Sequence, residues 1–280
     1  MWEYTPICKE MVIMAINGLG YLNQVNSTDK ARQSLIKQIS TGSAHPSASY
    51  GPSDYAISVR MNSNIGAAEQ SNNNTQTMNS LLNVAAGGVS STVNALSSLR
   101  SQILQAANGT NKDTDVAAIQ KNVNQTIATV NDNASVEYNG KKLLDGSASL
   151  TVAGIDGYKN VQLGNMTAQG LGLTDENGNS KIDLSTNEGI AAALDTVDSA
   201  LNAALDEETN IGSVQQNLTF ASANYTTQTE ALMNAESTSD DLDIAKAVTQ
   251  LSSANTQNQM AIYAQKLFMH NNASVLKLLQ

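Results

Sequence analysis

The chain has few of the residues that build disulfide-rich domains or aromatic cores. Its 280 residues include one cysteine and three prolines, and aromatic side chains make up 4% of the composition. A single cysteine, Cys8, excludes an intramolecular disulfide framework and a cysteine-based metal cluster. Much of the 41% hydrophobic content is alanine. Small side chains let helix backbones approach closely, so this composition favours packed helices over a sheet sandwich.

Charge is also scarce and mostly negative. There are 15 Lys and Arg against 25 Asp and Glu, a net charge of −10, and only 14% of residues are charged. The basic residues are scattered singly, so we predict no nucleic-acid partner. No run approaches the roughly 18 apolar residues of a transmembrane helix, and we predict no membrane insertion. The abundant Asn, Ser, Thr and Gln suit a surface that packs against copies of itself.

The first residues do not read as a secretory signal peptide. The sequence MWEYTPICKEMVIMAINGLG lacks a basic first region, and Lys9 and Glu10 interrupt the apolar one. We interpret residues 1–13 as a doubtful N-terminal extension, with Met1, Met11 and Met14 as alternative starts.

The strongest pattern is a seven-residue apolar repeat in the C-terminal half. Its members are Ile190, Val197, Ala204, Ile211, Leu218, Tyr225 and Leu232. The companion positions begin apolar and become polar: Leu194, Leu201, Glu208, Gln215, Ser222 and Thr229. This pattern is typical of one long helix, about 60 Å long at 1.5 Å per residue. Gly212 is the interior residue that we expect to weaken this helix.

Two further apolar stripes lie in the N-terminal half. The first consists of Leu82, Ala85, Val89, Thr92, Leu96, Leu99, Ile103 and Ala106. The second consists of Val116, Ile119, Val123, Ile127 and Val130. Between them, Asn108-Gly109 favours a turn, and Asp115 can cap the next helix.

These stripes predict a mainly α fold, in which long helices pack as an antiparallel bundle or coiled coil. The predicted seam of the bundle is Leu82, Val89, Leu96, Leu99, Ile103, Val197, Ile211, Leu218, Tyr225 and Leu232. Residues 138–185 differ, because they contain glycines, short apolar runs and the hairpin signals Asn139-Gly140 and Asp156-Gly157. We predict a small β-hairpin region there, with both termini returning to the same end.

No residue pattern indicates catalysis or a cofactor. His45 and His270 are far apart in sequence, and HExxH, CxxC and GxSxG motifs do not occur. Asp240, Asp241 and Asp243 lack the spacing of an EF-hand, and we interpret them as solvated residues near a helix N-terminus. We predict that the protein is not an enzyme and takes no cofactor or metal.

The chain finishes on apolar residues, in the sequence NNASVLKLLQ. A chain end is usually polar and frayed. Burial of each such side chain is worth about 1.5 to 3 kcal/mol. We therefore predict a partner that covers Val275, Leu276, Leu278 and Leu279.

Several motifs, in order along the chain, resemble bacterial flagellin. They are QISTGSAHPSASYGPSDYAISVRM at 38–61, LRSQILQAANGT at 99–110, YNGKKLLDG at 138–146, VQLG at 161–164 and the segment 232–279. The resemblance implies a subunit that is exported unfolded through the flagellar type III channel and polymerises into the extracellular flagellar filament for motility. It also implies export without a cleaved signal peptide, and a flagellar cap, junction proteins and an export chaperone as partners.

The resemblance also implies a division of the chain. Residues 14–42 and 240–280 correspond to terminal arms that pair as the inner domain of the filament and fold when neighbours cover them. Residues 43–239 correspond to an outer helical domain of a short form that lacks large outer insertions. The implied subunit-packing residues are Leu35, Ile39, Leu267, Phe268, Val275, Leu276, Leu278 and Leu279.

The sequence departs from the family pattern after Ser40-Thr41-Gly42, where Asp54 is the only charge in a segment that usually holds several. We expect the joint between the inner and outer domains to pack differently. The alternatives are a minor, junction or secreted flagellin homologue that does not form filaments alone, and an unrelated enzyme or phage fibre, which the ordered motifs disfavour.

A second departure concerns an immune receptor. Many flagellins carry a segment of the form LQRVRELAVQ, which vertebrate Toll-like receptor 5 binds. The aligned segment here is LSSLRSQILQ. Arg100 and Gln105 are retained, but Ser98 replaces the central arginine and Gln102 replaces a leucine. The resemblance therefore implies weak or no recognition by this receptor.

Overall fold

The computed structural model describes the backbone of residues 6–278 and the side chains of residues 19–274. Cys8, Val275, Leu276, Leu278 and Leu279 thus lie outside the described side chains. The chain forms two compact units, which we call the terminal unit (1–63 with 232–280) and the middle unit (Asn64–Ala231). The predicted limits at residues 42 and 240 fall beside the ends of helices. The interpretation of these segments as inner and outer domains stays a prediction.

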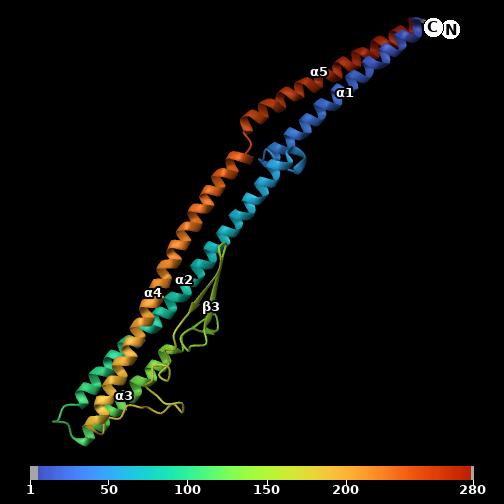
Figure 1. Cartoon of the computed structure of the whole chain (residues 1–280). Helices are drawn as coiled ribbons and strands as arrows, with labels where there is room; N and C mark the ends of the chain where they lie inside the picture. Colours follow the sequence, from blue (N-terminus) through green and yellow to red (C-terminus); the bar gives the residue numbers. More distant parts are fainter. Residues whose placement is uncertain (1–5, 279–280) are drawn as a thin grey trace. The chain divides into compact units, whose positions relative to one another are not determined.

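The fold is mainly α, as the apolar stripes predict (Figure 1). The helices are α1 (Pro6–Thr41), α2 (Pro52–Ala106), α3 (Asp113–Ala134), α4 (Asn187–Asp240) and α5 (Ile244–Leu278), with a short 3₁₀ turn at Ala48–Tyr50. The strands are β1 (Glu137–Tyr138), β2 (Lys141–Lys142), β3 (Ser149–Gly154) and β4 (Gly157–Gln162). They form two antiparallel two-stranded sheets.

The predicted seam forms the core of the middle unit. Its members on α2 are fully buried: Leu82, Val89, Leu96, Leu99 and Ile103. On α4, its buried members are Val197, Ile211, Leu218 and Tyr225. Leu232 is half-buried and belongs to the terminal unit. Gly212 does not interrupt α4, which continues without a break through it.

The polar edge of the long repeat has a structural role. Gln215 and Ser222 are half-buried on α4. The Gln215 amide donates to Asn83 Oδ1 at 2.9 Å, and the Ser222 hydroxyl donates to Asn72 Oδ1 at 2.6 Å. Both acceptors lie on α2. One edge of the seam therefore makes apolar contacts, and the other edge makes hydrogen bonds. Together they fix the rotation of α4 against α2.

The predicted turns are present, with one correction. Asn139 and Gly140 form the loop between β1 and β2, both with positive φ (51° and 74°), as a type I′ turn requires. In the second hairpin Gly157 pairs with Gly154, so the loop is Ile155-Asp156. The prediction that Asp156-Gly157 forms that turn is wrong by one residue. Gly157 instead begins β4 with a φ of 113°.

The turn between α2 and α3 is closed by side chains. The Asn111 amide donates to the Gln105 carbonyl at 2.7 Å. The Asp115 carboxylate accepts the backbone N–H of Lys112 at 3.1 Å. Asp115 therefore caps α3 from inside its first turn, while Lys112 occupies the N-cap position.

In the terminal unit, Asp240 joins two segments that are distant in sequence. Its carboxylate accepts the Ser43 hydroxyl at 2.7 Å and the backbone N–H of His45 at 3.0 Å, and lies 3.1 Å from His45 Nδ1. The backbone reinforces these contacts, since Ala44 N–H donates to the Asp240 carbonyl and Leu242 N–H donates to the Gly42 carbonyl. This network holds the break between α4 and α5 in place.

The interpretation of the aspartate cluster as solvated is therefore wrong for Asp240, which is 8% exposed and ends α4. Asp243 does lie at a helix N-terminus, where its carboxylate accepts Lys246 N–H at 2.9 Å. His45 also has acidic partners that its sequence neighbours do not reveal, because its Nε2 lies 3.7 Å from Asp54 Oδ2. Gly51 leaves room for the His45 side chain, because a Cβ at position 51 would lie 2.9 Å from the imidazole ring.

Substitution of Leu218 tests the seam. Leu218 is 3% exposed on α4, so Leu218→Ala should lower the free energy of unfolding by about 2 to 5 kcal/mol. Leu218→Asp should destabilise more, because it buries an unpaired charge. Phe220→Asp is the matched control, since Phe220 is 60% exposed two residues further along. Urea unfolding followed by circular dichroism measures the difference. Equal midpoints for Leu218→Asp and Phe220→Asp would show that the seam is not buried.

Substitution of Asp240 tests the hydrogen-bond network at the break between α4 and α5. Asp240→Ala removes the acceptor of the Ser43 hydroxyl and one of the two acceptors of the His45 N–H, which should cost about 1 to 3 kcal/mol. The control is Asp195→Ala, at an exposed position of α4. Hydrogen exchange of the Ala44 and His45 amides should accelerate in Asp240→Ala and stay unchanged in Asp195→Ala. Unchanged exchange in both variants would contradict the network.

Candidate functional site

Helices α1 and α5 form an antiparallel pair in the terminal unit (Figure 1). The rings of Tyr21 and Phe268 lie 5.6 Å apart between centroids, and the Asn258 amide donates to the Thr28 hydroxyl at 3.1 Å. At the other end, Ser43 is bridged to Asp241. Residue numbers rise on one helix as they fall on the other, so the helices run in opposite directions.

The seam of this pair is small and polar. On α5, buried Ala247, Ala254 and Ala261 alternate with half-buried residues at steps of three and four: Leu251, Asn258, Gln265, Phe268 and Asn272. On α1 the covered positions are Val25, Thr28, Arg32, Leu35 and Ile39. This spacing is that of a coiled coil. Three alanines and several polar side chains bury little apolar surface for a pair of this length.

Eleven large apolar side chains of the pair are exposed. They are Leu19, Tyr21, Leu22 and Ile36 on α1, and Ile244, Val248, Met260, Ile262, Tyr263, Leu267 and Met269 on α5. Their exposed fractions run from 38% to 66%. Exposed apolar side chains in such number are typical of an interaction surface. We therefore expect another molecule to cover these side chains.

Some of the predicted packing residues lie in the seam, and one lies on the exposed surface of the pair. Leu35, Ile39 and Phe268 are half-buried at seam positions, whereas Leu267 is 45% exposed. Their role in contacts between subunits stays a prediction. Sequence reasoning missed Val248, Met260, Ile262 and Tyr263. The seven-residue spacing of Ala247, Ala254 and Ala261 is the signal that could have placed them, because it defines the seam and therefore the outward face.

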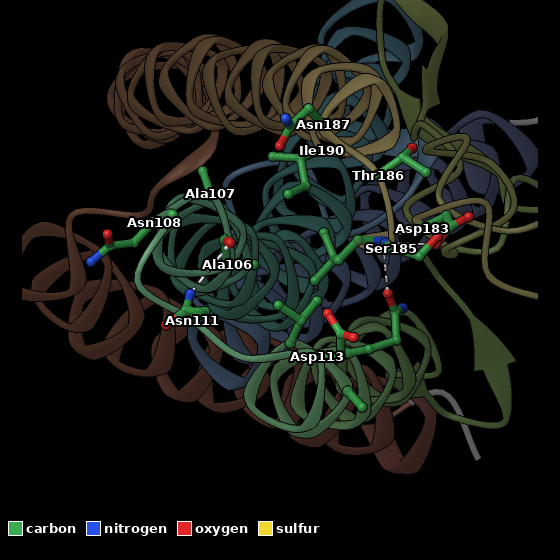
Figure 2. A pocket seen from close by; sticks show the side chains of 15 residues that line it. Ala106, Ala107, Asn108, Asn111, Asp113, Asp183, Ser185, Thr186, Asn187 and Ile190 are labelled. Atoms are coloured by element: carbon green, nitrogen blue, oxygen red, sulfur yellow. Dashed lines mark hydrogen bonds between the residues drawn. The ribbon is translucent and has the colours of Figure 1, made fainter.

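A cavity of about 610 Å³ in the middle unit lies between the α2–α3 turn and the start of α4 (Figure 2). Its polar groups serve the surrounding backbone. Asn111 donates to carbonyls of α2, and the Gln120 side chain bonds Ile182 O and Leu184 N. Hydrogen bonds from the Ser185 side chain and backbone hold the pKa of the Asp183 carboxyl below its ordinary value. This lining supports a loop structure and offers no nucleophile paired with a base.

The segment LSSLRSQILQ, which aligns with the receptor-binding segment of other flagellins, lies on α2. Ser98, Arg100 and Gln105 are exposed, and Gln102 is half-buried. Arg100 Nε donates to Asp198 Oδ1 on α4 at 2.6 Å, and this bond raises the pKa of Arg100. The Gln102 amide donates to the Thr126 hydroxyl on α3 at 3.1 Å. The Gln102 amide also donates to Ser98 Oγ at 3.4 Å, so three of the four side chains are engaged inside the subunit.

Within residues 6–278, no helix has an apolar stretch long enough to cross a membrane. Across the same part of the chain, no group of three or more His, Cys, Asp or Glu residues is placed to hold a metal ion.

Comparison with known proteins agrees with this geometry. The family described as the bacterial flagellin N-terminal helical region matches residues 14–149, and the bacterial flagellin C-terminal helical region matches residues 194–279. The chain is 30% identical over 249 residues to the flagellar filament 30.7 kDa core protein of Treponema maltophilum, covering 83% of this chain and 87% of that one.

Two further relatives extend the comparison. A flagellin of Bacillus subtilis (strain 168) is 29% identical over 277 residues, covering 87% of this chain and 91% of that protein. The fold is similar to a putative flagellar hook-associated protein from Vibrio parahaemolyticus, with a TM-score of 0.58, 18% identity, and coverage of 68% of this chain and 99% of that one. From its N-terminal helices to its C-terminal helix, the chain belongs to the bacterial flagellin family.

Proposed function

We propose that this protein is a structural subunit that polymerises into the bacterial flagellar filament through its α1–α5 pair. One observation carries the proposal. Much of the seam consists of alanine and polar residues, and eleven large apolar side chains of the pair are exposed. A helix pair of this kind gains most of its apolar burial when neighbouring copies cover it.

Family membership supports a structural and extracellular role, since several relatives are named flagellar filament core proteins. The middle unit has its own continuous apolar core, which includes residues of α2, α3, α4 and the hairpins. We expect it to fold without neighbours, while the terminal pair becomes stable on assembly.

The flagellar cap, the junction proteins and an export chaperone are further proposed partners, which rest on the family alone. A minor, junction or secreted homologue that does not form filaments alone is the alternative function. Negative-stain microscopy of the purified protein distinguishes the two. Helical filaments from this chain by itself support the main proposal, and their absence at high concentration supports the alternative.

Removal of residues 275–280 tests the role of the apolar end. We expect this truncation to abolish polymerisation and to leave the middle unit folded, because the apolar cluster of that unit lies within residues 78–218. Sedimentation measures polymer, and circular dichroism measures the helical content of the remaining chain. Gln257→Ala, at an exposed polar position of α5, is the control that should still polymerise. A truncated protein that pellets as filaments would overturn the proposal for this segment.

Recognition by Toll-like receptor 5 is expected to be weak or absent. Loss of a bidentate arginine contact and an apolar anchor costs about 2 kcal/mol or more each at a hot spot, or more than a hundredfold together. Ser98→Arg with Gln102→Leu should restore part of the signal in a reporter-cell assay. Ser97→Arg with Ser101→Leu, at exposed neighbouring positions, is the matched control. An unsubstituted monomer that signals as strongly as a flagellin with the full segment would refute this expectation.

A further inference from the structure

Glu207 places a carboxylate in the apolar seam of the middle unit. It lies on α4 between the buried residues Ala204 and Ile211, and it is itself only 9% exposed. Within the described residues, its Oε1 is one of three buried side-chain atoms without a hydrogen-bond partner. None of the ion pairs in this part of the chain includes Glu207. A buried carboxylate without a counter-charge is costly, which points to a positively charged ligand.

The second oxygen of Glu207 faces the end of strand β4. A Cβ at Gly164 would lie 3.0 Å from Glu207 Oε2, so glycine at this position leaves space for the carboxylate. Asn210 Nδ2 lies 3.5 Å from Glu207 Oε2 and 3.5 Å from the carbonyl oxygen of Gln162. Gln162 is the last residue of β4. One side-chain amide thus stands between a carboxylate on α4 and a backbone carbonyl of the hairpin.

The two contacts of Asn210 are long for hydrogen bonds. N–H···O bonds in proteins usually measure about 2.7 to 3.2 Å between the heavy atoms. Asn210 is exposed, and the two ends of its amide have nearly the same shape. A half-turn of the amide would put Oδ1 in the place of Nδ2. Three oxygen atoms, from Glu207, Asn210 and Gln162, would then surround one point.

The spacing of these atoms fits a calcium ion. Ca²⁺ takes oxygen ligands at about 2.3 to 2.6 Å, so two ligands at right angles lie roughly 3.3 to 3.7 Å apart. The ligands of Mg²⁺, at about 2.0 to 2.1 Å, lie roughly 2.9 Å apart. The separations of 3.5 Å therefore match Ca²⁺ and are too wide for Mg²⁺.

We propose that Glu207, the Asn210 side chain and the Gln162 carbonyl bind Ca²⁺, with water in the remaining coordination positions. The ion supplies the positive charge that the buried carboxylate lacks. Two of the three ligands are an amide and a backbone carbonyl, so no metal-binding motif of the sequence marks the site. Because Gln162 ends β4 and Glu207 lies on α4, the bound ion would tie the β3–β4 hairpin to α4.

The surroundings of the site favour a cation of modest affinity. Val161 and Leu163, on either side of Gln162, are buried, and an apolar environment strengthens the attraction between carboxylate and ion. The middle unit also has more than twice as many acidic as basic residues, which attracts cations to it. A site with a single carboxylate should bind weakly, with a Kd on the order of 10⁻⁴ to 10⁻³ M.

Isothermal titration calorimetry of the unpolymerised, full-length protein tests the proposal. The protein is freed of metal with a chelator and titrated with CaCl₂ in about 0.15 M KCl, which screens the exposed acidic residues. Glu207→Gln keeps the shape of the side chain and removes its charge, so the affinity for Ca²⁺ should fall at least tenfold. Glu208→Gln, at the next and half-buried position, is the matched control and should bind like the unsubstituted protein. Titration with MgCl₂ should show at least tenfold weaker binding.

Asn210→Asp provides a gain of affinity at an exposed position, where substitution is compatible with folding. It adds a second carboxylate to the site and should tighten Ca²⁺ binding about tenfold or more. Unsubstituted protein that takes up no Ca²⁺ at about ten times the expected Kd would overturn the proposal. Equal affinities of Glu207→Gln and Glu208→Gln would also overturn it, because Ca²⁺ would then bind elsewhere. If Glu207→Gln does not fold, an unchanged affinity in Asn210→Asp is the result that contradicts the site.

Discussion

The approach of α1 to α5 along an alanine seam is the constraint on which the terminal unit depends. Ala247, Ala254 and Ala261 are small enough to bring the two backbones together, and Asn258 bonds Thr28 across the gap. A polar pair in an otherwise narrow seam fixes the register of a coiled coil. Because six of the eight seam positions of α5 are alanine or polar, most of the larger apolar residues of α5 lie outside the seam.

The middle unit distributes its residues in the opposite way. Leu82, Leu96 and Ile103 on α2 are completely buried, and Leu218 on α4 is nearly so. Its polar positions form defined bonds, such as Arg100 with Asp198. One chain therefore combines a unit that covers its own core with a helix pair that leaves apolar surface uncovered. Such a division allows a stable subunit whose terminal helices gain their burial from neighbouring copies.

Much of the fold could be predicted from the sequence, and the reason is periodicity. The seven-residue repeat from Ile190 predicts α4, and Asn139-Gly140 predicts the first hairpin. The joint could not be predicted, because His45 and Asp240 are 195 residues apart and no local pattern connects them. The exposed apolar residues of α5 could not be predicted either, because they lie on several sides of the helix and form no single apolar stripe.

The scarcity of charge follows from the same architecture. Desolvating a neutral amide or hydroxyl costs less than desolvating an ion, and such groups can bond a polar partner in either orientation. The terminal pair illustrates this. Four glutamines directly precede seam residues, at positions where many soluble coiled coils place Glu and Lys: Gln24, Gln38, Gln250 and Gln257. A surface of Asn, Gln, Ser and Thr thus stays soluble in the free subunit and still accepts burial against another copy. With only 14% of residues charged, the chain is suited to a polymer in which much of each surface faces an identical neighbour.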